Sequence, residues 1–83
     1  MHNSNYKSFS LIKRKFGEDT GSHLSVFIGE SISDPKMLAD VKTYIHLYLS
    51  AYTDLSFDEI KYQLANFTDT LQYDNYVIEL KEI

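Results

Sequence analysis

Apolar residues recur at helical spacing in one long stretch, from Asp34 to Thr53. At 100° per residue they fill one continuous arc, while the opposite arc is polar except for Leu47. Asp34 followed by Pro35 is a typical helix start, because the carboxylate accepts bonds from free amides and proline has no N–H to lose. The stretch therefore predicts a long helix lying with one side on a core. The apolar arc consists of Met37, Leu38, Val41, Tyr44, Ile45, Tyr48, Leu49 and Tyr52.

Three tyrosines follow one another along one margin of this arc. Tyr44, Tyr48 and Tyr52 are each four residues apart, so they lie in a row on the helix. One interpretation is a core margin, with the rings buried and the hydroxyls in water. The other is a stripe that binds a partner, and both remain open.

A second helix is predicted to start at Ser56. Ser56 and Glu59 have the spacing of a capping box, and Leu55 with Ile60 has that of a hydrophobic staple. Because the joint to the first helix is short, the two helices should form an αα-hairpin. The apolar stripe of this second helix consists of Phe57, Ile60, Leu64, Phe67 and Leu71.

Apolar residues alternate in three other stretches, as they do in β-strands. The first is 6–16, where the phase breaks at Ile12 and predicts either a bulge there or a strand covered on both faces. The second is 23–32, with Leu24, Val26 and Ile28 predicted to face the core. Residues 17–22, which connect these two predicted strands, have the composition of a hairpin loop. After a turn at 73–75, the third stretch is 76–83.

The predicted element order is ββααβ, a two-layer α+β domain with a three-stranded sheet packed on the helical hairpin. The last strand could pair antiparallel with the second or parallel with the first, so the sheet is antiparallel or mixed. The first strand suits an exposed edge, because Lys13, Arg14 and Lys15 discourage pairing with other chains. The predicted core consists of Leu24, Val26, Ile28, Leu38, Val41, Ile45, Leu49, Ile60, Leu64, Phe67, Ile78 and Leu80.

Composition supports one folded domain over residues 1–83, with 1–5 as a flexible tail. The content of 43% hydrophobic and 14% aromatic residues argues against disorder, and no apolar run is long enough for a membrane helix. The start of the chain lacks the apolar run of a secretory signal, and there is no cysteine. These features predict a cytoplasmic protein, and the preference for Lys over Arg suggests AT-rich coding in a bacterium or its phage.

Charge is distributed unevenly along the chain. The net charge is −4, but residues 1–17 carry +4 and residues 18–83 carry −8. The acidic body would repel phosphate, which disfavours direct binding of nucleic acid and favours a protein partner with a basic surface.

Residue patterns for catalysis are missing from the sequence. The histidines lack metal-ligand spacing, no serine has a nucleophile motif, and the glycines form no phosphate loop. We therefore expect no catalytic residue, no cofactor and no metal, and keep a minor enzyme or enzyme subunit as the least favoured hypothesis.

A basic segment offers an alternative function. Lys13, Arg14 and Lys15 lie between Phe9 and Phe16, a pattern that could bind phosphate and stack on a base. The competing interpretation of the same segment is the charged edge strand described above.

The favoured hypothesis is a small, acidic, non-catalytic interaction protein. It would be an inhibitor or regulator of phage or plasmid type, in the anti-CRISPR-like class, that binds a larger basic or nucleic-acid-handling protein. A homodimer through a sheet edge or the tyrosine row is an alternative use of the same surfaces. The candidate partner-binding residues are Tyr44, Tyr48, Tyr52, Asp54, Asp58 and Glu59.

Overall fold

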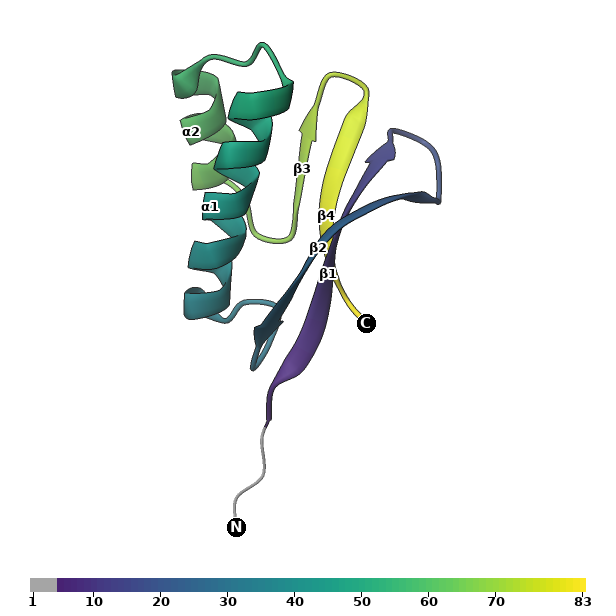
Figure 1. Ribbon diagram of the computed structural model, residues 1–83, viewed down its shortest axis with the longest axis vertical. Helices are drawn as coiled ribbons and strands as arrows, with labels where there is room; N and C mark the ends of the chain where they lie inside the picture. The colour runs from purple at the N-terminus through teal and green to yellow at the C-terminus, as the bar shows by residue number, and fades with distance from the viewer. Residues whose placement is uncertain (1–4) are drawn as a thin grey trace.

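The computed structural model describes residues 5–83 and has two layers, with two helices on one side of a four-stranded sheet (Figure 1). The strands lie in the order β2-β1-β4-β3, and all neighbours are antiparallel. The predicted α+β class and two-layer arrangement are confirmed. Of the predicted tail, residues 1–4 lie outside the described residues. The elements are β1 (Lys7–Lys15), β2 (Gly21–Gly29), α1 (Pro35–Tyr52), α2 (Phe57–Ala65), β3 (Thr70–Tyr73) and β4 (Tyr76–Glu82).

Helix α1 begins where the sequence predicts. Asp34 Oδ1 accepts the amides of Lys36 at 2.9 Å and Met37 at 3.3 Å, while Oδ2 accepts the amide of Glu30 at 2.8 Å. One carboxylate therefore caps the helix and holds the chain that leads into it. The buried stripe of α1 consists of Met37, Val41, Ile45 and Leu49.

Helix α2 also begins as predicted but ends earlier. Ser56 Oγ accepts the amide of Glu59 at 3.1 Å, and Glu59 Oε1 accepts the amide of Ser56 at 3.4 Å, which completes the capping box. The helix ends at Ala65, and Asn66 donates its side-chain amide to the Tyr62 carbonyl at 2.9 Å. The predicted extension to Leu71 is wrong, because this asparagine cap is followed by residues with low helix propensity.

Residues 70–73 form a fourth strand that was not predicted: the stripe of the second predicted helix ran to Leu71, and a turn was predicted from Tyr73. Leu71 and Tyr73 are buried while their neighbours are exposed, which is the alternation of a strand. Asp74 at φ 50° makes the tight turn to β4 that was predicted at this point. Because of this extra hairpin, β4 runs antiparallel to β1 and pairs with it. The two predicted pairings of the last strand, antiparallel with the second strand or parallel with the first, are therefore wrong.

Strand β1 lies in the middle of the sheet, between β2 and β4, so its predicted position at an edge is wrong. A bulge occurs where the phase of the sequence breaks. Leu11 pairs with Ser25 and Ile12 pairs with His23, which leaves Leu24 as the extra residue in β2.

The bulge decides which face of β2 meets the helices. Val26 and Ile28 are 47% and 63% exposed on the open face of the sheet, whereas Phe27 points inward and packs against α1. Their predicted place in the core is therefore wrong, because one extra residue moves every following side chain to the opposite face.

The remaining core follows the prediction closely. Leu24, Leu38 and Leu64 pack against it but are only partly buried. None of the helices in the described part of the chain is long and apolar enough to span a membrane. The buried apolar residues are Phe9, Leu11, Met37, Val41, Ile45, Leu49, Ile60, Phe67, Leu71, Tyr73, Val77, Ile78 and Leu80.

Replacement of Ile45 by Ala should lower the free energy of unfolding by ~2–5 kcal/mol, because it leaves a cavity at the centre of the fully buried stripe of α1. The matched control is Leu47→Ala on the same helix, whose side chain is 64% exposed. Urea unfolding of both variants checks this, and equal losses would show that Ile45 does not lie in the core.

The Asp34 cap should make stability depend on acidity. Bonding to the Glu30 amide, aided by the Met37 and Lys36 amides, outweighs desolvation and lowers the pKa of Asp34 below its ordinary 3.8. Because the pKa is depressed in the folded state, the charged cap stabilises the protein above pH 3.8 and is lost as the pH falls through the folded value.

Asp34→Asn should therefore have a lower melting temperature than the wild type near neutral pH, and this difference should disappear in acid. Circular dichroism at a series of pH values measures it, with Asp40→Asn, an exposed aspartate that caps no helix, as the control. A difference that stays constant into acid would contradict the role of the carboxylate.

Candidate protein-binding surface

The tyrosines of α1 differ in how much of each ring faces solvent. Tyr44 is partly buried: its ring lies edge-on to Phe27 at 5.9 Å, and its hydroxyl donates to the Leu24 carbonyl at 3.2 Å. It thereby supports the bulge in β2. Tyr48 is also partly buried, whereas Tyr52 is 74% exposed. Only the last member of the row thus presents most of its ring to a partner.

Lys13 from β1 occupies the centre of an aromatic cluster. Its Nζ lies 4.1 Å from the centroid of the Tyr76 ring and donates to the Tyr48 hydroxyl at 3.2 Å. The rings of Tyr73 and Tyr76 are 5.7 Å apart, and those of Tyr48 and Tyr52 are 5.0 Å apart. We call Lys13 with these four rings the tyrosine cluster; it joins α1 to the sheet through cation–π contacts and hydrogen bonds.

The ionisation states in the tyrosine cluster follow from these contacts. Burial lowers the pKa of Lys13, but hydrogen bonding to the Tyr48 and Tyr73 hydroxyls outweighs it and raises the pKa above its ordinary 10.5. Burial also raises the pKa of Tyr73 above its ordinary 10.0, against the opposing effect of Lys13. At neutral pH the lysine is therefore charged and the buried tyrosine is a neutral hydroxyl.

Beside the tyrosine cluster is an open cleft of about 490 Å³, where the end of α1 meets the β3–β4 turn. Asp54 and Asp74 bring two carboxylates to it, one from each of these segments. Asp54 was among the predicted partner-binding residues, whereas Asp74, Tyr73 and Tyr76 were not, because no hairpin was predicted there. The lining residues are Lys13, Tyr52, Thr53, Asp54, Leu55, Tyr73, Asp74 and Tyr76.

The other predicted acids lie nearby in the sequence but do not line the cleft. Asp58 and Glu59 are exposed in the first turn of α2, and the Glu59 carboxylate is held in the capping box. Asp58 has the freer carboxylate of the two.

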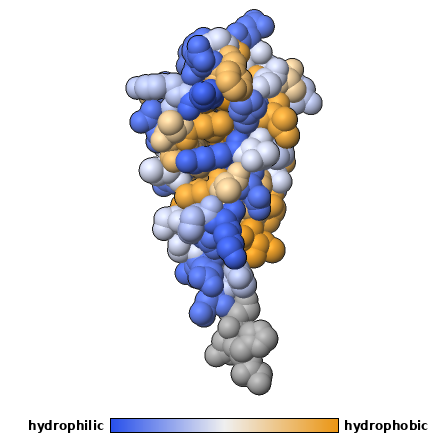
Figure 2. All heavy atoms as spheres, turned by 90° about the vertical axis from the view of Figure 1, so that its left-hand side faces the viewer, coloured by the Kyte–Doolittle hydropathy of each residue, from blue (hydrophilic) through white to orange (hydrophobic). Residues whose placement is uncertain are grey.

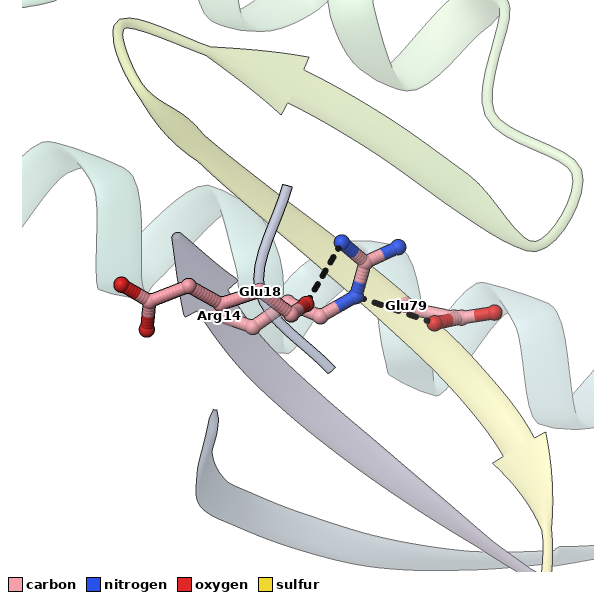
Figure 3. A network of polar contacts seen from close by, with 3 residues as sticks. All are labelled: Arg14, Glu18 and Glu79. Atoms are coloured by element: carbon pink, nitrogen blue, oxygen red, sulfur yellow. Dashed lines mark hydrogen bonds and ion pairs between the residues drawn. The ribbon is translucent and has the colours of Figure 1, made fainter. Parts of the chain in front are cut away.

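The basic segment is divided between two faces of the sheet. Lys13 points towards the helices, whereas Arg14 lies on the other side, where its Nε is 3.5 Å from Glu79 and its Nη1 donates to the Glu18 carbonyl at 3.3 Å (Figure 3). Phe9 is fully buried, although Phe16 is exposed. The predicted phosphate-binding and base-stacking residues Lys13, Arg14, Lys15, Phe9 and Phe16 therefore do not share one surface.

The outer side of the helical layer is chemically mixed. Figure 2 shows apolar patches there separated by hydrophilic side chains. A shallow groove between the helices is lined by Leu47, Leu64 and His46, among others. The centroid of the His46 ring lies 5.5 Å from that of the Phe57 ring. Within residues 5–83, no group of three or more His, Cys, Asp or Glu side chains could hold a metal ion.

No protein-family model, curated protein or solved structure matches this chain. The cleft beside the tyrosine cluster combines the exposed ring of Tyr52 with the carboxylates of Asp54 and Asp74.

Lys13→Met should destabilise the fold by about 0.5–1 kcal/mol, because methionine keeps an apolar stem but loses the cation–π contacts. The matched control is Lys15→Met, two residues along β1 and exposed. Urea unfolding compares the two, and the ring protons of Tyr48 and Tyr76 should shift in NMR spectra for Lys13→Met alone. Equal effects of both substitutions would contradict a special role for Lys13.

Proposed function

We propose that this protein is a small, non-catalytic inhibitor or regulator that binds a larger basic protein through the cleft beside the tyrosine cluster. The observation that carries the proposal is the meeting of Tyr52, Tyr73 and Tyr76 with Asp54 and Asp74 in one open cleft. Tyrosine is favoured at the energetic centres of interfaces, and carboxylates attract basic partners.

Rigidity of the cleft supports the same proposal. Lys13 holds Tyr48 and Tyr76 in place before a partner arrives, so less side-chain entropy is lost on binding. The charge of −8 over residues 18–83 also favours encounter with a positive surface.

The positively charged surfaces that would attract this acidic chain are common on proteins that handle nucleic acid. We propose that the protein acts in the cytoplasm on such a nucleic-acid-handling protein, as a phage- or plasmid-type inhibitor or regulator of the anti-CRISPR-like class. In this proposal the protein competes with nucleic acid for the basic surface and contacts no nucleic acid itself.

Two substitutions in the cleft should weaken capture of the partner. Tyr52→Ala removes exposed aromatic area and should speed dissociation, whereas Asp54→Lys reverses a charge and should slow association. Each should lower the affinity for the partner by roughly tenfold. The measurement is capture from a host extract on immobilised protein, with mass spectrometry, followed by binding kinetics on the purified partner.

Matched controls are available on the same chain. Tyr62→Ala removes a tyrosine that is 71% exposed on α2, and Asp40→Lys reverses an exposed acid of α1 outside the cleft. Both should bind like the wild type, and Asp58→Lys tests whether the surface extends onto α2. If the cleft variants and the controls bind equally, or if the captured proteins are acidic, the proposal is wrong.

A further inference from the structure

The two edges of the sheet differ in how well they are protected. At one edge, β3 has only four residues, and Gln63 of α2 donates its side-chain amide to the Gln72 carbonyl at 3.0 Å. At the other edge, β2 has nine residues, Gly21–Gly29, without a Lys, Arg, Asp, Glu or Pro. A long uncharged edge is a template for pairing with another strand.

The register shows which backbone groups of β2 point outward. The Ser8 carbonyl accepts the Ile83 amide at 2.9 Å, so the backbone groups of Ser8 face β4. In an antiparallel pair, its partner Ile28 then directs its N–H and C=O away from β1. Val26, two residues earlier and paired with Ser10, does the same. Within residues 5–83, nothing bonds to these outward groups of Val26 and Ile28.

We propose that β2 pairs antiparallel with β2 of a second copy of this chain, with the two-fold axis at Phe27. In this register Val26 lies opposite Ile28 of the second copy, and each such pair exchanges two hydrogen bonds through the outward groups. The side chains of both residues, exposed on the open face, then become apolar cross-strand neighbours. The result is one eight-stranded sheet shared by two chains.

A second copy fits this edge better than an arbitrary extended segment. With Phe27 on the two-fold axis, the apolar Val26 of each chain lies opposite the apolar Ile28 of the other. Each chain carries a net charge of −4, so two copies can approach closely only along an uncharged strip, and β2 is such a strip. A two-fold pairing uses the β2 edge of both chains, so it closes at two copies, and at the opposite edge Gln63 already bonds the Gln72 carbonyl.

The dimer should be weak, with a dissociation constant on the order of micromolar, because one strand pair buries a small interface. Sedimentation velocity of the whole protein across roughly a thousandfold range of concentration around that value measures it. Val26→Pro should leave a folded monomer, because the lost N–H points away from β1 and proline is tolerated at such an edge position. Ile28→Lys should also give a monomer, because it places a charge in the contact.

The matched control is Thr70→Lys, which adds the same charge on the same face at the β3 edge and should leave the dimer unchanged. The hydrogen-exchange rates of the Val26 and Ile28 amides should fall as the protein concentration rises, while the rates of the Thr70 and Gln72 amides should stay the same. Circular dichroism checks folding, and Ile28→Lys still decides the question if Val26→Pro unfolds. A monomeric wild type at every concentration, or a dimer that survives in the folded β2 variants, overturns the proposal.

Discussion

Burial of the α1 stripe against the sheet is the interaction on which the rest of the structure depends. Ile45 and Leu49 are fully buried, as are Leu11 and Ile78 of the central strands. Each such side chain contributes about 1.5–3 kcal/mol, whereas only 5–15 kcal/mol remains in a typical domain after the entropy cost of folding, so the loss of a single buried side chain is a large change in net stability. The same packing sets the height of α1 above the sheet, and therefore decides how far Lys13 must reach to meet Tyr48.

The elements that could be predicted from sequence are those governed by local chemistry. The caps at Asp34 and Ser56 depend on bonds across a few residues, and so the starts of both helices were predictable. The bulge in β2 was visible only as a phase break at Ile12 of the partner strand. Which strand would take the extra residue depends on packing against α1, and this is why Val26 and Ile28 were assigned to the wrong face.

The candidate cleft was harder to foresee because its residues come from three separate segments. Tyr52 ends α1 and Asp54 follows it in the joint to α2, Tyr76 begins β4, and Lys13 belongs to β1. The tyrosine row was visible as a helical periodicity, but its meeting with the β3–β4 turn depends on a hairpin whose apolar residue Leu71 also continues the stripe of α2. A four-residue strand carries too short an alternation to outweigh that helical pattern.

The cleft and the β2 edge are made by different residues and lie at different levels of α1. Phe27, on the proposed two-fold axis, packs against Tyr44 in the middle of α1, whereas the cleft begins at Tyr52, eight helical residues or roughly 12 Å further along. Pairing of two copies through β2 uses no residue of the cleft, so both clefts would stay open in the dimer. Such a dimer gains avidity only from a partner that presents two basic sites at matching separation, because a cleft that cannot reach a second site adds nothing to the affinity of the first. A partner with one basic site would bind each cleft of the dimer with the same affinity as the cleft of the monomer. The ratio of the affinity for the dimer to that for the monomer therefore shows whether the partner carries one such site or two.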